Sequence, residues 1–262
     1  MRRTICGLIA VVLLGLTGTA VVAVGTAGGH SHTAGRTAVA APAAPASIQA
    51  ATDLAALTPA AGTTQIASPK AGSYGLILWD RPGGQVAGAV STTTWGGPSA
   101  RPIIKSVPGW VQIRLDSRPN ASTGWVERSD VNITTTNYRI AISVSQRSLT
   151  LYQNNLPIYS APVGVGQPQW PTPIGPSFID AIVPVPARQQ RIYGPFVLIT
   201  ATHSNVFTEF DGGDGTVGIH GYPSDPASTR GVASSHGCIR ANPQTIEAIR
   251  VVPAGTPLDI IA

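Results

Sequence analysis

The chain has 262 residues, a length that allows one or two domains, and its 43% hydrophobic residues are enough to form a packed core. Only 11% of the residues are charged, and the formal net charge of +5 favours anionic surroundings such as a cell envelope. No Lys/Arg-rich run with interleaved aromatic residues is present, so we expect no nucleic-acid partner. The 29 Gly and 23 Pro residues favour turns and short strands over long helices, which predicts a mainly β protein.

The N-terminus has the composition of an export signal. Two arginines follow Met1, residues 5–24 carry no charge, and small residues follow at 25–27 and 38–40. An apolar stretch of about 20 residues is at the lower limit for crossing a bilayer. We therefore interpret residues 1–40 as a signal peptide or membrane anchor. The protein is expected to be exported to the cell envelope, with residues 5–24 as its only membrane contact.

The chain contains two cysteines, Cys6 and Cys238. Cys6 lies at the start of the apolar stretch, so signal cleavage would leave Cys238 as the single thiol. A lone cysteine is a liability in an oxidising compartment, because it oxidises or cross-links. One unpaired cysteine in a secreted chain therefore favours the interpretation that its thiol is reactive.

The middle of the chain divides into a linker and a small β domain. Residues 41–69 are rich in Ala, Pro, Thr and Ser without a sustained apolar period, which predicts a linker. Residues 70–133 contain short β-rich runs separated by turn residues. The predicted strands are 75–79, 85–90, 101–106, 110–115 and 123–126. Five short strands in about 60 residues predict a small β-barrel.

The segment GWVQIRLDSRPNASTGWVERSDV, residues 109–131, resembles bacterial Src-homology-3-like domains, which often accompany cell-wall enzymes. The resemblance implies either a spacer that positions the next domain or a wall-binding module. The sequence leaves both readings open.

Residues 137–262 form a second β-rich unit. Its predicted strands are 138–144, 148–153, 156–162, 177–182, 196–200, 216–220 and 257–261. One amphipathic helix is predicted after Asn242, which serves as N-cap, with Pro243 at the first helical position. Ile246, Ile249 and Val252 then recur at helical spacing.

Cys238 lies in the string SSHGCIRAN, residues 234–242, which offers the groups that a catalytic thiol needs. A nearby base favours the thiolate, and backbone amides stabilise the developing oxyanion. His203, His220 and His236 are the candidate bases, and spacing alone does not choose among them. Gly237 opens the backbone amides to a substrate carbonyl, and Arg240 offers a planar fork suited to a carboxylate.

Two other interpretations of this thiol are disfavoured. A zinc site would need His203, His220, His236 and Cys238, but a His-x-Cys pair is tight for tetrahedral ligation and no carboxylate or CxxC has metal-like spacing. An inert buried thiol fits poorly with the polar, loop-like surroundings. We expect no metal and no cofactor. His203 is expected to satisfy backbone groups or to line the rim of a cleft.

The chain resembles the bacterial L,D-transpeptidases with a YkuD-type catalytic domain. Their motif is a histidine followed, after a loop, by Ser/Thr-His-Gly-Cys, an apolar residue and Arg or Asn. The matching strings here are IHG at 219–221 and SHGCIR at 235–240. Softer agreement includes LTLYQNN, PTPIG, IYGPF and the ending PAGTPLDIIA. The resemblance implies a small barrel followed by a β-sandwich-like L,D-transpeptidase catalytic domain, residues 137–262, with one or two short helices.

The resemblance also implies a mechanism. Cys238 attacks a peptidoglycan tetrapeptide stem, D-Ala leaves, and the amine of a second stem resolves the thioester into a 3→3 cross-link. His220 would be the base, oriented by the carbonyl of Gly221, and the amides of His236, Gly237 and Cys238 would form the oxyanion hole. The residues expected to contact the substrate are Arg240, Ser235 and Tyr193. Donor and acceptor stems would be the partners of a monomeric enzyme, and carbapenems would acylate Cys238.

Two alternatives to transfer remain open from the sequence. The same thioester could be released to water by an L,D-carboxypeptidase or a cysteine peptidase of the wall. A non-catalytic wall-binding protein is the third reading, and the intact pair of Cys238 and His220 argues against it.

Overall fold

The computed structural model describes residues 62–210 and 213–262. The predicted signal segment, 1–40, and most of the predicted linker, 41–69, lie outside these residues. No helix within the described ranges is both long enough and apolar enough to span a membrane.

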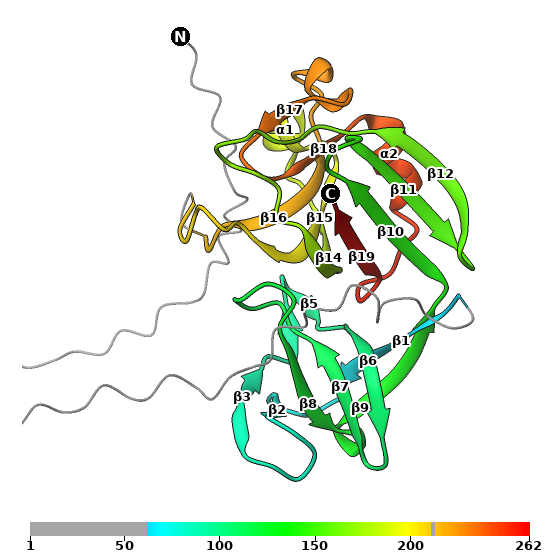
Figure 1. The fold of residues 1–262 in the computed structure, drawn as a ribbon, viewed down its shortest axis with the longest axis vertical. Helices are drawn as coiled ribbons and strands as arrows, with labels where there is room; N and C mark the ends of the chain where they lie inside the picture. The colour runs from blue at the N-terminus through cyan, green and yellow to red at the C-terminus, as the bar shows by residue number, and fades with distance from the viewer. Residues whose placement is uncertain (1–61, 211–212) are drawn as a thin grey trace, which may run out of the picture.

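The N-terminal unit is a nearly closed antiparallel sheet, as the sequence predicted. Its seven strands follow the order β3-β2-β8-β7-β6-β1-β9 (Figure 1). Their bounds are β1 Thr64–Pro69, β2 Leu76–Trp79, β3 Val86–Val90, β6 Arg101–Val107, β7 Trp110–Arg114, β8 Thr123–Glu127 and β9 Val131–Thr136. A short hairpin, β4 Thr93–Thr94 and β5 Gly97–Pro98, projects between β3 and β6, and the 3-10 helix η2 Arg128–Asp130 precedes β9. Alternate side chains of the strands, such as Leu76, Leu78, Val111 and Ile113, fill the interior.

The predicted boundary of the linker at residue 69 is wrong, because β1 lies inside it. Residues 64–69 pair with both β6 and β9 and join the barrel sheet. Ile66 and Ala67 are buried there. The sequence did not predict this strand, because Ile66 and Ala67 are its only apolar residues and the others are Thr, Gln, Ser and Pro. The sheet also continues to Thr136, three residues beyond the predicted end of the barrel.

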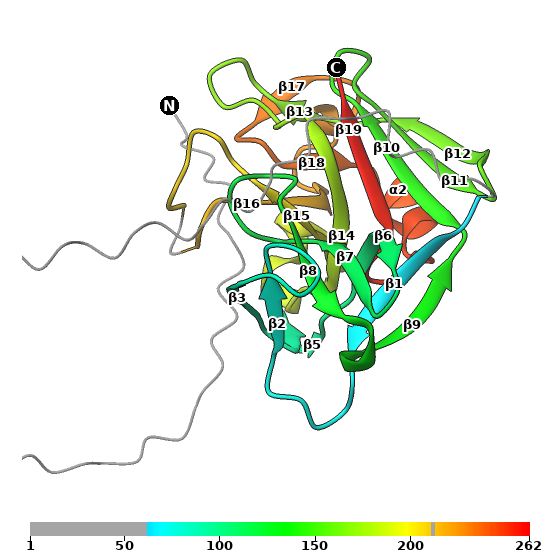
Figure 2. The ribbon, with the colours of Figure 1, turned by 60° about the horizontal axis from the view of Figure 1, so that its bottom comes forward.

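The C-terminal unit is built on an eight-stranded sheet with the order β12-β11-β10-β19-β14-β15-β16-β18. The strand bounds are β10 Tyr138–Ser143, β11 Ser148–Gln153, β12 Leu156–Pro162, β14 Gly175–Pro184, β15 Phe196–His203, β16 Thr216–Gly221, β18 Ile239–Ala241 and β19 Pro257–Ile261. Two short strands, β13 Val165–Gly166 and β17 Ala233–Ser235, form a separate parallel pair. Figures 1 and 2 show the barrel beside this larger unit, near β14 and β19.

Helices are short and few among the described residues. Besides η2 in the barrel, they are α1 Gln190–Tyr193, α2 Pro243–Ile249, and the 3-10 segments η3 Ala187–Gln189 and η4 Pro226–Thr229. Helix α2 begins as predicted, because the Asn242 side chain accepts a hydrogen bond of 2.8 Å from the Thr245 N–H. Ile246 and Ile249 point into the core of the larger unit. Residue 252, predicted to lie on the helix, follows its end but is also buried.

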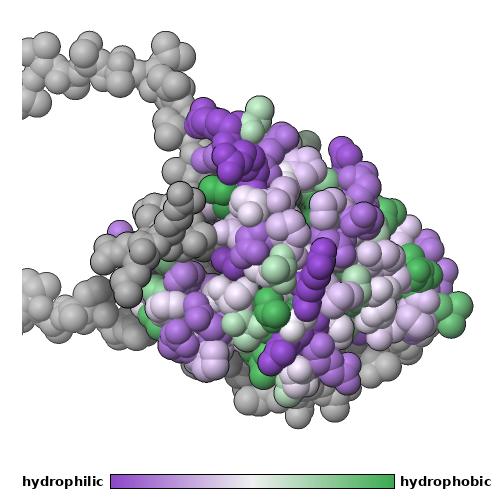
Figure 3. All heavy atoms as spheres, turned by 90° about the horizontal axis from the view of Figure 1, so that it is seen from above, coloured by the Kyte–Doolittle hydropathy of each residue, from purple (hydrophilic) through white to green (hydrophobic). Residues whose placement is uncertain are grey.

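The surface agrees with the low content of charged residues. The face in Figure 3 is mostly polar or intermediate in hydropathy, with isolated hydrophobic residues.

Candidate active site

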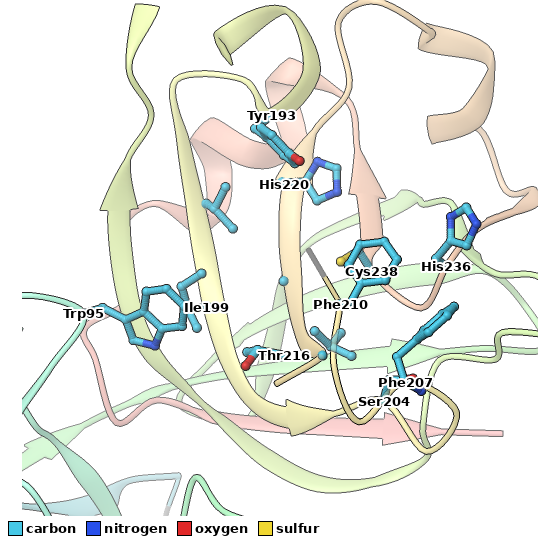
Figure 4. Close-up of a pocket in the computed structure, with 14 residues that line it drawn as sticks. Trp95, Tyr193, Ile199, Ser204, Phe207, Phe210, Thr216, His220, His236 and Cys238 are labelled. Atoms are coloured by element: carbon cyan, nitrogen blue, oxygen red, sulfur yellow. Dashed lines mark hydrogen bonds between the residues drawn. The ribbon is translucent and has the colours of Figure 1, made fainter. Parts of the chain in front are cut away.

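Cys238 lies in the turn between β17 and β18, beside the strand that carries His220. Strands β16 and β18 are parallel, with Ile219 opposite Ile239 and His220 opposite Arg240. Side chains alternate between the faces of a strand, so this register places Cys238 and His220 on the same face of the sheet. Both line one pocket (Figure 4). Cys238 is partly exposed and forms no disulfide with any described residue.

The His220 ring is held in one orientation. It is 1% exposed, and its Nδ1–H donates a hydrogen bond of 2.5 Å to the carbonyl of Gly221. Because Nδ1 faces a carbonyl acceptor, the proton of the neutral ring belongs on Nδ1. Nε2 is then the basic nitrogen, and it is buried without a hydrogen-bond partner. This geometry leaves Nε2 as a proton acceptor inside the pocket.

Tyr193 closes the pocket behind His220. It lies at the end of α1, is buried, and places its ring centroid 5.2 Å from that of His220. A Cβ added to Gly221 would lie 3.2 Å from the Cα of Gly194, so the end of α1 approaches β16 closely. Glycine at both positions allows this approach. The structure thus places Tyr193 in the pocket wall, where the sequence interpretation expected a substrate contact.

Ser235 and Thr172 hold the turn that carries Cys238. The Ser235 hydroxyl donates to the carbonyl of Cys238 at 2.6 Å and accepts from the N–H of Gly237 at 3.1 Å. The Thr172 hydroxyl donates to the carbonyl of Gly237 at 2.8 Å and accepts from the N–H of Gly166 at 2.9 Å. Gly237 has a φ of 121°, a conformation that favours glycine. These bonds fix the backbone on which the thiol stands.

Two expectations about this turn need correction. Ser235 is 0% exposed, so it supports the turn and does not reach a substrate. The amide of Gly237 is engaged by the Ser235 hydroxyl, so it does not point at a substrate oxyanion in this conformation. The sequence could not show that the serine before His-Gly-Cys would fold back onto its own turn.

Arg240 also lies elsewhere than expected. Its side chain is 4% exposed and is not part of the pocket wall. The guanidinium contacts the carbonyl and hydroxyl of Ser234 at 3.3 and 3.2 Å and stacks 4.3 Å over the Tyr222 ring. This placement does not support direct recognition of a substrate carboxylate. It ties β18 to β17.

Two aromatic side chains that the sequence interpretation overlooked, Phe207 and Phe210, line the opposite side of the pocket. His236 packs against Trp170 with ring centroids 4.1 Å apart, and Phe207 and Phe210 lie 6.1 and 5.9 Å from it. Both phenylalanines belong to the loop between β15 and β16 and line the pocket with Cys238. In the sequence, the two phenylalanines of the polar loop NVFTEF, residues 205–210, were the feature that could have indicated this wall of the pocket. They make this side of the site apolar.

The β15–β16 loop is attached to the barrel. Arg118 donates to the carbonyls of Ser204, Phe207 and Asp214 at 2.6, 2.9 and 2.6 Å. Asn120 exchanges two hydrogen bonds of 2.7 Å with the backbone of His203. The barrel therefore fixes the loop that carries the pocket aromatics.

His203 has the structural role that the sequence favoured. Its ring Nε2 lies 2.8 Å from the carbonyl of Asp116 in the barrel, and Nδ1 lies 3.0 Å from the carboxylate of Asp214. It does not line the pocket that contains Cys238. Within residues 62–210 and 213–262, no three His, Cys, Asp or Glu side chains are grouped to hold a metal ion.

Comparison with known proteins agrees with this geometry. The YkuD family, described as the L,D-transpeptidase catalytic domain, matches residues 137–260. Over residues 137–260, the chain is therefore similar to YkuD-type L,D-transpeptidase catalytic domains. This match includes every residue of the Cys238 turn and of the strand that carries His220. The barrel lies outside it, and the resemblance of the barrel to Src-homology-3-like domains stays a prediction.

Two curated relatives are similar over the same domain. The YkuD proteins of Bacillus subtilis and Bacillus licheniformis are 36% and 34% identical over 124 residues, which is 47% of this chain. The chain spans 65% of the length of each of these relatives. Among solved structures, L,D-transpeptidase 3 from Mycobacterium tuberculosis matches with 13% identity and a TM-score of 0.39, over 56% of this chain and 77% of that one. An L,D-transpeptidase from Mycobacterium smegmatis matches with 16% identity and a TM-score of 0.38, over 58% and 91%.

Proposed function

We propose that this protein is a peptidoglycan L,D-transpeptidase that forms 3→3 cross-links through a thioester on Cys238. The observation that carries the proposal is the pairing of Cys238 with His220 on one face of neighbouring strands. Nε2 of His220 is buried without a partner there, while Nδ1 is fixed by Gly221. An oriented base beside a thiol is the arrangement that activates a cysteine nucleophile.

Acylation follows from this pairing. Nε2 of His220 takes the proton of the Cys238 thiol, and Sγ attacks the carbonyl that joins the third residue of a tetrapeptide stem to its terminal D-Ala. The C–N bond of that amide breaks, and the imidazolium returns the proton to the leaving amine of D-Ala. A thioester between Cys238 and the stem remains, and no redox step occurs.

The oxyanion that forms during this attack needs nearby N–H donors. The turn of residues 236–238 is the candidate, since it surrounds the nucleophile. The Gly237 amide already donates to Ser235. The oxyanion must therefore be met by the other amides of the turn, or by Gly237 after Ser235 releases it.

The walls of the pocket favour transfer over hydrolysis. They are mostly apolar, with Tyr193, Val197, Ile199, Phe207 and Phe210 among them. The cavity is narrow, with a volume of about 50 Å³. A thioester reacts readily with amines, so an acceptor amine held in this narrow site competes well with water. This step gives the new amide bond and returns the thiol.

The setting of the reaction also fits the chain. Peptidoglycan lies outside the membrane, which agrees with the export signal predicted for residues 1–40. The formal charge of +5 suits an anionic envelope. We therefore place the enzyme in the cell envelope and expect carbapenems, which carry a reactive acyl group, to acylate Cys238.

The test is product analysis with the purified full chain. Incubation with a tetrapeptide-bearing muropeptide should release D-Ala and give a 3→3 dimer, detected by mass spectrometry. Cys238→Ala should abolish both products, and His220→Gln should lower the rate by about 100-fold or more, as loss of a general base does. Cys6→Ala is the matched control and should retain activity. Tripeptide without dimer would show an L,D-carboxypeptidase, and no product from the wild type would overturn the proposal.

A further inference from the structure

A second pocket lies between the barrel and the catalytic domain, next to the one that contains Cys238. Its volume is about 270 Å³. The lining residues are Trp95 and Asp116 from the barrel, with Asp180, Thr200, His203, Asp214 and Thr216 from the catalytic domain. Trp95 and Thr216 line both pockets, so the two adjoin. The second pocket is polar, unlike its neighbour.

Asp180 gives this pocket a buried hydrogen-bond acceptor. The residue is 2% exposed, and its Oδ2 accepts a hydrogen bond of 2.6 Å from the Thr94 hydroxyl. Its Oδ1 is buried and no hydrogen bond of normal geometry reaches it. Asp116 and Asp214 have basic partners in Arg101 and His203, whereas Asp180 has no ion pair with any described residue. A buried acceptor without a well-aligned partner is costly, so a ligand hydroxyl that reaches it would be favoured.

The pKa of Asp180 agrees with this description. Burial raises it, and the Thr94 hydroxyl opposes that effect. Asp116 raises it further, while the charge of Arg101 and a hydrogen bond from the Trp95 indole N–H, longer or more bent than a normal one, lower it.

Trp95 adds an apolar face beside these acceptors. It stands at the tip of the β4–β5 hairpin and is 39% exposed (Figure 4). Its φ of 48° is unfavourable for a bulky side chain, at a cost of roughly 1–2 kcal/mol. Such strain is typical of functional positions. A ring face flanked by carboxylate and hydroxyl oxygens matches a pyranose, which has an apolar C–H face and a rim of hydroxyl donors.

The spacing from the nucleophile fits a sugar attached to a stem. Strands β18, β16, β15 and β14 are consecutive neighbours, so Asp180 on β14 lies three strand spacings from the Cys238 turn, about 14 Å. The catalytic pocket runs the same way, over Gly218 on β16 and Ile199 on β15 to Trp95. An extended donor stem, from its third residue back through the lactyl group to the sugar, covers about four residue lengths, or roughly 13–14 Å.

We infer that this pocket is a saccharide subsite, which binds the N-acetylated muramyl sugar that carries the donor stem. The inference rests on the proposed function, since the stem must reach Cys238. It gives the barrel a direct part in substrate binding through the Trp95 indole. The peptide and the sugar of one donor would then bind in adjoining pockets.

The test compares two donors with the full chain, a free tetrapeptide and the same tetrapeptide on its disaccharide. The wild type should acylate Cys238 with a kcat/KM roughly tenfold higher for the sugar-bearing donor, mostly through KM, the size expected of one stacking contact and a hydrogen bond. Trp95→Asn should bring this ratio close to one, because Asn-Gly keeps the hairpin turn while removing the indole. Tyr74→Ala, an exposed aromatic residue of the barrel, is the matched control and should keep the wild-type ratio.

Equal kcat/KM values for the two donors in the wild type, or a ratio that persists in Trp95→Asn, would overturn the inference. If neither donor acylates the wild type, the proposed function fails instead. Saturation-transfer NMR with the free disaccharide then decides the inference separately. A signal from the wild type that Trp95→Asn loses would support the subsite, and no signal from the wild type would overturn it.

Discussion

Replacement of Arg118 by methionine should release the β15–β16 loop from the barrel. The guanidinium donates to the carbonyls of Ser204, Phe207 and Asp214, all at 2.9 Å or less. A hydrogen bond with a charged partner contributes about 1.5–3 kcal/mol, and partly exposed bonds fall at or below the lower end. The three together should contribute about 3 kcal/mol, and methionine keeps the length of the side chain but none of the donors.

A loss of this size changes the opening equilibrium of the loop by about 100-fold, since 1.4 kcal/mol corresponds to a factor of ten. Hydrogen exchange measured by mass spectrometry reports such local opening. The amides of Val206 and Phe207, which donate to the Ser204 hydroxyl, should exchange about 100-fold faster. The rate of Cys238 acylation should fall as well, because Phe207 and Phe210 leave the pocket wall.

The control is Arg81→Met, which removes an exposed ion pair of 3.0 Å with Asp80 and should leave the loop unchanged. Unchanged exchange in Arg118→Met would show that the barrel does not hold the loop. An equal increase throughout the catalytic core would show global destabilisation instead, and would also refute the reasoning.

Three further predictions concern the support of the site. Gly237→Ala should lower the free energy of unfolding by roughly 1–3 kcal/mol and slow Cys238 acylation at least tenfold, because a φ of 121° strains any other residue. Thermal melting and acylation rates measure these two effects. Thr172→Val should lower the free energy of unfolding by about 2–3 kcal/mol in denaturant titrations, since two buried hydrogen bonds to the backbone are lost. The control Thr150→Val, on a partly exposed strand, should change the free energy of unfolding little. Asp180→Asn should raise Tm at neutral pH, because burial raises the pKa of this carboxyl and its ionised form opposes folding. The gain should vanish as pH falls below the ordinary value of 3.8, and the exposed Asp225→Asn should show none of it.

Local pattern was enough to predict most of the larger strands and the start of α2. The strand runs alternate apolar and polar residues, and Asn242-Pro243 is a local start signal that needs no tertiary contact. Strands β17 and β18 were missed because each has three residues and is defined by its partner in another part of the chain. The same reason hid β1, whose polar sequence becomes a strand only between β6 and β9.

The site was predictable to the extent that its candidate residues lie in two short motifs, IHG at 219–221 and SHGCIR at 235–240. Cys238 and His220 were found by motif, and the structure brings them to one face. The surroundings were not predictable in this way, because Ser235 bonds to its own turn and Arg240 bonds to Ser234 on β17, contacts that the motif does not reveal. Trp95 comes from the barrel and reaches the pocket only through the packing of the two units.

The account as a whole depends on an acyl-enzyme at Cys238. Intact-mass spectrometry of the full chain, mixed with a tetrapeptide-bearing donor and quenched in acid within milliseconds, tests this most directly. The account predicts an adduct equal in mass to the donor minus D-Ala, located on the Cys238 peptide, absent in Cys238→Ala and retained in Cys6→Ala. No adduct on the wild type, or an adduct that survives in Cys238→Ala, would contradict it.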